Sequence, residues 1–248
     1  MKEKLSVWKI YRNSYRYLVS HLFAFAFLTI FYFIGNILPI LIGIHSGFLY
    51  SVFTAIYAFV FFYFAAGCYF KQQLLFNKEI FIASGIRFFL AVALFLIALL
   101  VANFLINFSI LNISASFGNN FIDWLLSSYI WLIGKNLFIL FLFVLFFIIP
   151  SFAFVSEINA KNKSLLVTYI KTKGNVFRIC LVVFIAFFLL LLIMFLMSYL
   201  NIILAAFLRS VVFVYISLLY FKMYDFFYAN TLKVKWAKFK KFITLMEE

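Results

Sequence analysis

The sequence predicts an all-α, polytopic membrane helical bundle of six transmembrane helices, with both termini in the cytoplasm and amphipathic interfacial helices at both ends. Three observations lead to this prediction: the composition, the length of the apolar segments, and the charge of the connections between them. Of the 248 residues, 68% are hydrophobic and only 11% are charged. About a quarter of the residues in a soluble domain are charged, so the expected solvent of this chain is lipid.

The apolar segments have the length of membrane-spanning helices. A hydrocarbon core of about 30 Å requires roughly 20 apolar residues in a helix, because backbone polar groups in lipid must bond within their own segment. The sequence contains six such segments, and together they make residues 1–248 a single transmembrane domain. We expect the spans at residues 22–44, 48–70, 88–110, 136–155, 179–199 and 202–221.

Basic residues occur in every second connection. Arg12 and Arg16 precede the first span, Arg87 precedes the third, and Arg178 precedes the fifth, whereas residues 45–47, 111–124 and 200–201 contain no Lys or Arg. Basic connections remain in the cytoplasm, so this alternation predicts six spans with both termini inside, in a bacterial cytoplasmic membrane. It also accounts for the net charge of +14 without a nucleic-acid partner.

The region 124–155 allows two interpretations. It is almost continuously apolar, and as one helix it would be about 48 Å long, more than one untilted crossing requires. We expect an outer interfacial or re-entrant segment at 121–134, with the span beginning near Asn136 after Gly134 and Lys135. The alternative is one tilted helix with a kink at Lys135.

Three segments have the pattern of interfacial helices: residues 1–20, 164–173 and 230–248. In each of them apolar residues recur at helical spacing beside basic residues, which are Lys and Arg in the first segment and Lys alone in the other two. Such helices lie flat, with the cations near anionic lipid headgroups. Their role is either anchoring or the docking of a cytoplasmic partner.

A candidate surface for a cytoplasmic partner or for lipid headgroups surrounds the second of these segments. Its residues are Glu157, Lys171, Lys173, Gly174, Asn175 and Arg178. The pair Gly174-Asn175 follows two lysines and can adopt a positive φ, which predicts a helix C-cap before the fifth span.

Two basic residues, Lys135 and Arg209, are predicted on the side of the outer leaflet and are candidate binding residues for an anionic group. Lys135 and Arg209 lie in or beside apolar spans, where a lone cation costs about 2.5 kcal/mol or more. Asp123 is the acidic residue predicted on that side. Either each cation extends toward the surface and Arg209 pairs with Asp123, or both cations bind an anionic group such as a lipid phosphate.

Polar residues within the spans are few. Asn103 and Asn107, four residues apart on the third span, are candidate interhelical hydrogen-bonding residues; the alternative is Na⁺ binding. The spans contain no carboxylate of the kind that usually couples transport to protons or sodium.

The sequence contains no catalytic or cofactor-binding motif. HExxH, GxSxG, GxxxxGK[ST] and CxxC motifs are absent, and Cys68 and Cys180 lie far from any second cysteine or histidine. We therefore expect no catalytic residue, no metal site and no cofactor, and a protein that is not an enzyme.

The stretch from Pro150 to Arg178 resembles a known family. The matching positions are Pro150, Glu157, Thr168, Tyr169, Thr172, Gly174, Asn175, Phe177 and Arg178. They resemble the six-helix bacterial membrane family of YciC-type proteins and of the membrane domain fused to some glycerophosphodiester phosphodiesterases. Thr168, Tyr169 and Lys171 stand where the family often has Ser, Trp and Leu. The resemblance implies an architecture and no reaction.

These observations favour a non-enzymatic inner-membrane protein with a lipid-related, assembly or transport-accessory role. The alternatives are the permease subunit of an ABC-type exporter, docked on a cytoplasmic ATPase, and a secondary transporter. The expected partners are membrane lipids, with anionic headgroups at the cytoplasmic face, and in the second case an ATPase or other membrane subunits.

Overall fold

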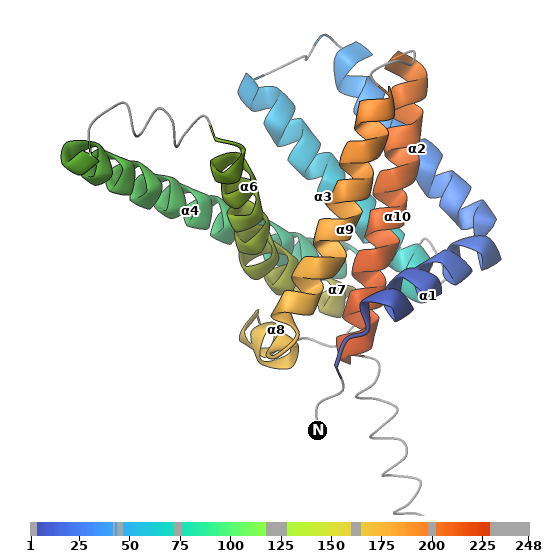
Figure 1. Cartoon of the computed structure of the whole chain (residues 1–248). Coiled ribbons are helices and arrows are strands. Elements are labelled where there is room, and N and C mark those ends of the chain that lie inside the picture. The colour runs from blue at the N-terminus through green and yellow to red at the C-terminus, as the bar shows by residue number, and fades with distance from the viewer. Residues whose placement is uncertain are drawn as a thin grey trace, which may run out of the picture.

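The structure is a computed structural model, and it describes residues 4–41, 43, 47–71, 76–117, 128–159, 165–197 and 202–228. All regular secondary structure in these ranges is helical (Figure 1). The helices are α1 (Val7–Ser20), α2 (Leu22–Leu41), α3 (Gly47–Lys71), α4 (Lys78–Phe117), α6 (Tyr129–Phe143), the π-helical turn η1 (Val144–Ile148), α7 (Ile149–Ile158), α8 (Leu165–Thr172), α9 (Val176–Met197) and α10 (Ile202–Tyr228).

The predicted all-α class is confirmed, and the long apolar helices are consistent with a membrane helical bundle. Among the residues that the structure describes, five stretches are long and apolar enough to cross a membrane: Leu22–Pro39, Leu49–Phe70, Lys78–Ile110, Ile133–Ile158 and Leu204–Tyr228. A bent pair, α8 with α9, makes a sixth if it is counted as one span; its two helices meet at 94°. This bend sets α8 across the end of the bundle, as expected for an interfacial helix that precedes a span (Figure 1).

The predicted break at Gly134–Lys135 is wrong. Helix α6 runs without interruption from Tyr129 through Gly134, Lys135 and Asn136, and η1 and α7 continue it to Ile158. Gly134 is compatible with a continuous helix, and Lys135 is exposed on its surface, so neither residue forces a break. Of the expected outer segment 121–134, residues 121–127 lie outside the described part of the chain.

The irregularity in this long helical stretch lies at η1 instead, and Pro150 explains it. Ile149 donates its N–H to the Val144 carbonyl, five residues earlier. In the same pattern, the Leu145 carbonyl would accept a hydrogen bond from the backbone N–H of residue 150. That residue is Pro150, and proline has no N–H. The Leu145 carbonyl instead accepts a hydrogen bond of 2.6 Å from the Tyr169 hydroxyl. Helix α8 therefore satisfies a backbone group that Pro150 leaves free.

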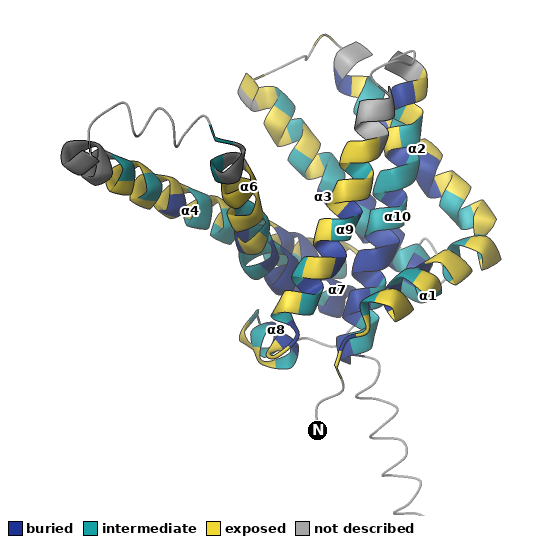
Figure 2. Ribbon diagram, viewed as in Figure 1, coloured by how far each residue is buried: buried dark blue, intermediate teal, exposed yellow. Residues whose placement is uncertain are grey.

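The core lies toward the end of the bundle that α1 and α8 cover. Nine of the ten residues of α7 are buried, and the second half of α10 contributes Leu219, Phe221 and Tyr224, each at most 1% exposed. Figure 2 shows this burial concentrated in α7 and the adjacent part of α10, while α1, α3 and α9 carry many exposed residues. Many of the exposed side chains are apolar, as expected where lipid is the surrounding solvent.

The predicted N-terminal and central interfacial segments are helices α1 and α8. The C-cap after α8 is confirmed: Gly174 has a φ of +85°, and Lys173 and Asn175 donate their N–H groups to the carbonyls of Tyr169 and Thr172. The predicted basic tail, 230–248, lies outside the described residues.

Gly35 provides a test of the packing between α2 and α3. A Cβ atom at this position would overlap the ring of Tyr57, whose hydroxyl donates a hydrogen bond to the Phe31 carbonyl. Gly35→Ala must displace this ring, and overpacking of this kind typically costs about 1–3 kcal/mol. We expect a lower melting temperature in detergent.

The matched control is Gly134→Ala. An added Cβ meets nothing within 4 Å there, and alanine is favoured over glycine inside a helix by about 0.5–1 kcal/mol. The melting temperature of this variant should be unchanged or slightly higher. Equal melting temperatures for the two variants would show that Gly35 is not a close-packing position.

Candidate functional site

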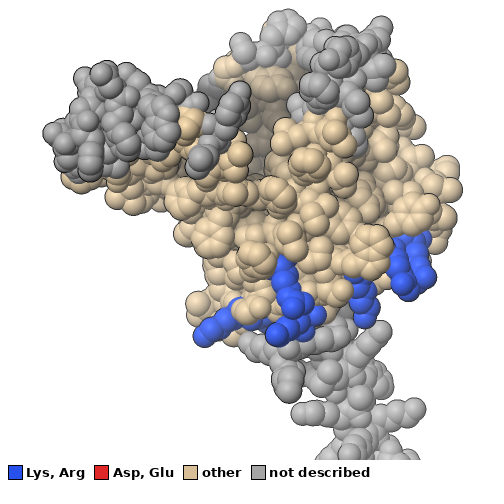
Figure 3. All heavy atoms as spheres, viewed as in Figure 1, with Lys and Arg blue, Asp and Glu red and all other residues tan. Residues whose placement is uncertain are grey.

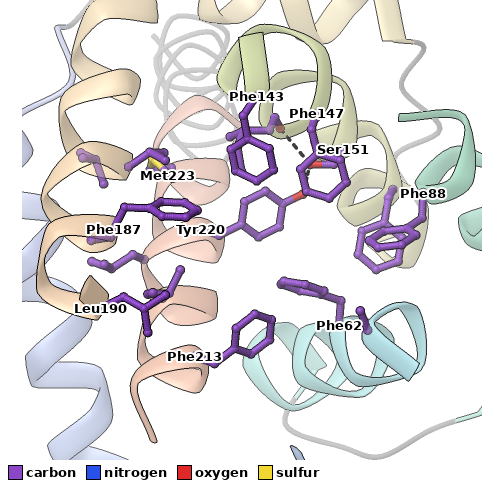
Figure 4. Close-up of a pocket in the computed structure, with 18 residues that line it drawn as sticks. Phe62, Phe88, Phe143, Phe147, Ser151, Phe187, Leu190, Phe213, Tyr220 and Met223 are labelled. Carbon is purple, nitrogen blue, oxygen red and sulfur yellow. Dashed lines mark hydrogen bonds between the residues drawn. The ribbon is translucent and has the colours of Figure 1, made fainter. Parts of the chain in front are cut away.

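The most distinctive feature inside the bundle is a cavity of about 270 Å³. Residues of α3, α4, α6, η1, α7, α9 and α10 line it. Seven of them are phenylalanines: Phe62, Phe88, Phe143, Phe147, Phe154, Phe187 and Phe213. Figure 4 labels all of these phenylalanines except Phe154 and shows the labelled rings around a common space. An apolar cavity of about 150 Å³ can remain dry and bind benzene, so this cavity has room for a larger hydrocarbon group.

Two hydroxyl groups, those of Ser151 and Tyr220, lie in the cavity wall (Figure 4). They are hydrogen-bonded to each other at 2.9 Å. The Ser151 hydroxyl also lies 2.9 Å from the Ile148 carbonyl, to which it can donate. Both residues are buried, Ser151 at 2% and Tyr220 at 6% exposed. The two hydroxyl groups are hydrogen-bonded to each other. They therefore leave little hydrogen-bonding capacity for a ligand in the cavity.

This arrangement favours binding over catalysis. The Ser151 hydroxyl is hydrogen-bonded to the Ile148 carbonyl and the Tyr220 phenol, whereas an activated serine needs an adjacent general base. No charged side chain is among the described residues that line the cavity. A buried polar or charged ligand group would lose its hydration here without compensation. The cavity is therefore suited to hydrocarbon.

The cavity reaches the surface between α6 and α9. Phe187 is 39% exposed, and its ring lies 6.0 Å from that of Phe143, which is partly exposed on α6. In the space-filling view the surface is hollowed between the part that contains α6 and the part that contains α9 (Figure 3). An apolar chain could therefore enter sideways from the bilayer.

Lys135 and Arg209, the predicted outer-leaflet cations, are both exposed. Lys135 is on α6 and Arg209 is on α10, and α9 packs against both of these helices. The prediction that they bind one anionic group stays a prediction. Asp123, the proposed partner of Arg209, lies outside the described residues.

Within the described part of the chain, Asn103 and Asn107 lie on the exposed surface of α4, and the interhelical contact expected of them stays a prediction. Their exposed neighbours include Leu100 and Phe104. The physical reason for this exposure is the length of α4: its 40 residues carry its second half past the helices on which its first half packs (Figure 1).

Glu157 faces inward and is not part of an open cytoplasmic surface. Its carboxylate lies 2.7 Å from the guanidinium of Arg87 on α4, and its side chain is only 14% exposed. Arg87 also donates to the Ala153 carbonyl on α7 at 3.4 Å. These contacts fasten α4 to α7, a structural role that the prediction for Glu157 did not include.

Asn175 and Arg178 hold the N-terminal segment rather than an external partner. The Asn175 side-chain oxygen accepts from the backbone N–H of Leu5 at 2.8 Å, and Arg178 donates to the Leu5 carbonyl at 2.7 Å. Leu5 is fully buried. We call this arrangement, formed by Leu5, Asn175 and Arg178, the N-terminal latch.

Helix α1 continues this attachment. The Tyr11 hydroxyl donates to the Val182 carbonyl on α9 at 2.8 Å. Burial raises the pKa of Tyr11 well above its usual range, so the hydroxyl keeps the proton that it donates. The amphipathic helix α1 is thus attached to the bundle by a side-chain hydrogen bond.

The other members of the predicted cytoplasmic surface divide into two kinds. Lys171 lies over the ring of Tyr228, with its ammonium group 4.2 Å from the ring centroid. Lys173 and Gly174 are exposed and remain candidates for contact with headgroups or a partner.

The cavity is the feature that the sequence did not reveal, because its wall is assembled from seven separate elements. The phenylalanines that line it are a small part of the 40 in the chain, so they do not stand out. The nearest sequence signal was Ser151, a polar residue directly after Pro150 within an apolar span.

Among the described residues, no group of three or more His, Cys, Asp or Glu side chains could hold a metal ion. Comparison with protein-family models, with curated proteins and with solved structures gave no significant match.

Proposed function

We propose that this chain is a non-enzymatic, multi-pass protein of the bacterial cytoplasmic membrane that holds the apolar chain of a membrane lipid in the cavity between α6, α9 and α10. The observation that carries the proposal is the cavity itself: about 270 Å³, lined by seven phenylalanines, and reaching the surface at Phe187. Its most abundant potential ligands are the acyl or isoprenoid chains of the surrounding bilayer.

The proposed topology has six spans and both termini at the cytoplasmic face. Its support is the distribution of charge: Lys and Arg side chains gather at the end of the molecule that carries α1 and α8 (Figure 3). Basic segments remain in the cytoplasm. Trp8 and Tyr15 are 76% and 62% exposed on α1, and such aromatic residues are favoured at the membrane interface.

Filling the cavity tests the proposal. Ala186 is 4% exposed on α9 and lines the cavity. In Ala186→Phe the new ring would occupy space that a bound chain needs. We expect the lipid that co-purifies with the wild-type protein in mild detergent, measured by native mass spectrometry, to fall at least about tenfold, which corresponds to a loss of about 1.4 kcal/mol of binding free energy.

The control is Ala26→Phe, because Ala26 is exposed on α2 and does not line the cavity. This variant should retain lipid like the wild type. Both variants must have the helical circular dichroism of the wild type. If Ala186→Phe is folded and retains as much lipid as Ala26→Phe, the cavity is not the lipid site.

A second candidate function is the permease subunit of an ABC-type exporter, and helix α8 favours it. This short helix lies across the basic end of the bundle and exposes Leu166 and Ile170 at 69% and 55%. Exposed apolar side chains there would suit a docked ATPase as well as the bilayer interface. Recovery of an ATPase with the purified protein would support this candidate, and recovery of lipid alone would support the first.

A secondary transporter, the third class, stays a prediction. Asn103 and Asn107, the residues considered for Na⁺ binding, are both exposed on α4.

A further inference from the structure

A second, smaller pocket lies between α2 and α3, and its wall is polar. It has a volume of about 20 Å³, which is enough for one water molecule or one oxygen atom of a ligand. Five polar side chains line it, and we call it the tyrosine pocket: Tyr32, Asn36, Tyr50, Thr54 and Tyr57. All five lie within the apolar stretches Leu22–Pro39 and Leu49–Phe70, where polar residues are rare and often form a functional site.

Arg209 stands beyond the end of the apolar cavity, on the face of α10 that lines it. Phe213, Ile216 and Tyr220 belong to the cavity wall. Arg209 precedes Phe213 by four residues, so it continues the same face of α10 one turn farther from Tyr220. Its side chain is exposed, and a ligand that extends out of the cavity along this face therefore reaches it.

Tyr32 and Ala58 connect Arg209, the tyrosine pocket and the cavity. The Arg209 guanidinium is close enough to the Tyr32 hydroxyl to interact with it electrostatically. The ring of Tyr32 is stacked on that of Phe213, with the centroids 4.1 Å apart, and Phe213 lines the cavity (Figure 4). Ala58 lines both the tyrosine pocket and the cavity. A polar site and an apolar site thus adjoin each other.

The tyrosine pocket is suited to an anion. The Thr54 hydroxyl donates to the Tyr50 carbonyl at 2.8 Å, and the Tyr57 hydroxyl donates to the Phe31 carbonyl, so these two donors already have acceptors. Arg209 adds five N–H donors and no acceptor. No acidic side chain among the described residues lines the pocket. The complementary ligand is a negatively charged acceptor, and a phosphate matches the planar guanidinium with two parallel hydrogen bonds.

The position of Arg209 along α10 fits the phosphate of a lipid. Arg209 lies five residues inside the apolar stretch Leu204–Tyr228, about 7.5 Å at 1.5 Å per residue. Arginine side chains at this depth extend toward the interface between hydrocarbon and headgroups. The guanidinium can therefore meet a headgroup phosphate, while the chain of the same lipid lies at the level of the cavity.

We infer that the lipid of the proposed function has a negatively charged phosphate headgroup, which Arg209 binds at the tyrosine pocket while the chain lies in the cavity. Tyr32 and Tyr50 supply hydroxyl donors to the same phosphate. The inference rests on the proposed function, because it assigns a headgroup to the lipid whose chain the cavity holds.

Two lipids with identical chains test the inference. Dioleoyl phosphatidylglycerol is anionic and dioleoyl phosphatidylcholine is zwitterionic, so the cavity contributes equally to the binding of both. Each lipid is added to the protein in mild detergent, and bound lipid is measured by native mass spectrometry. We expect the wild type to bind phosphatidylglycerol at least about tenfold more tightly, equivalent to about 1.4 kcal/mol. Arg209→Gln should lose this preference and bind both lipids as the wild type binds phosphatidylcholine.

Tyr32→Phe and Lys78→Gln complete the series. Tyr32→Phe keeps the ring that stacks on Phe213 and removes only the hydroxyl, so it should reduce the preference by less than Arg209→Gln does. Lys78→Gln removes an exposed cation at the start of α4, outside the tyrosine pocket, and should keep the preference of the wild type. All variants must have the helical circular dichroism of the wild type. A wild type without preference, an Arg209→Gln variant that keeps it, or an equal loss in Lys78→Gln would overturn the inference.

Ala186→Phe separates this inference from the proposed function. If Ala186→Phe binds both lipids like the wild type, the cavity is not the lipid site and the proposed function fails. If Ala186→Phe loses both lipids while Arg209→Gln keeps the preference, the cavity stands and the headgroup inference fails.

Inorganic phosphate separates a lipid headgroup from a free anion. Phosphatidylglycerol bound by both its chain and its headgroup should remain bound in excess inorganic phosphate, compared with chloride at the same ionic strength. If phosphate lowers the binding of phosphatidylglycerol to that of phosphatidylcholine, the tyrosine pocket is a site for the free anion and the inference is wrong.

Discussion

Replacing Arg87 by alanine is expected to lower the free energy of unfolding in detergent by about 3 kcal/mol. Glu157, only 14% exposed, would lose the guanidinium that lies 2.7 Å from its carboxylate. Removal of one partner of a buried ion pair typically costs about 3–5 kcal/mol, because a charge remains without compensation in a medium that solvates it poorly. The partial exposure of Arg87, 27%, places the expected value at the lower end.

The measurement is a melting curve followed by circular dichroism, and the control is Lys78→Ala. Lys78 is an exposed cation at the start of the same helix, and loss of a surface charge usually changes stability by no more than about 0.5 kcal/mol. A double variant, Arg87→Ala with Glu157→Ala, should recover part of the loss because it leaves no unpaired charge. Similar melting temperatures for Arg87→Ala and Lys78→Ala would show that the ion pair contributes little.

Opening the N-terminal latch has the second large expected effect. In a variant with Asn175→Ala and Arg178→Ala, both backbone groups of the fully buried Leu5 lose the partners at 2.8 and 2.7 Å. Hydrogen bonds to charged groups contribute about 1.5–3 kcal/mol, and an unsatisfied buried group costs about 1–3 kcal/mol. We expect the segment before α1 to open in a local equilibrium that leaves the bundle folded.

Limited trypsin digestion reports this opening, because Lys4 and Lys9 flank Leu5. Cleavage there should accelerate roughly 100-fold, the equivalent of about 2.8 kcal/mol. Lys173→Ala, an exposed neighbour of the N-terminal latch, should digest like the wild type. If the double variant is cut no faster than Lys173→Ala, then other contacts, such as that of Tyr11, hold the segment.

The features predicted correctly are those that depend on local sequence. An amphipathic pattern of apolar and basic residues is sufficient to indicate α1 and α8, and a glycine after two lysines is sufficient to indicate the cap at Gly174. Runs of about 20 apolar residues identify membrane-spanning helices because lipid excludes other structures. The resemblance of Pro150–Arg178 to a six-helix family stays a prediction.

The features that were missed depend on contacts between distant residues. Asn175 and Arg178 have the appearance of surface residues, and only the fold brings Leu5, 170 residues away from Asn175 in sequence, against them. The same holds for Glu157, whose partner Arg87 is on another helix. The assignment of a break to Lys135 failed because a charged residue at a helix surface does not interrupt hydrogen bonding, whereas a proline does.

The π turn at Val144–Ile148 affects how the whole stretch from Tyr129 to Ile158 must be mapped. A π turn uses i→i+5 bonds, one residue more than an α turn, so it advances the helix direction by roughly 100° relative to uninterrupted α-geometry. A helical wheel that treats the stretch as one α-helix therefore assigns Ser151 and Glu157 to the wrong sides when it is anchored at Lys135. Deletion of one residue within the turn would rotate α7 against α6, so that Phe143 and Ser151 could no longer both face the cavity.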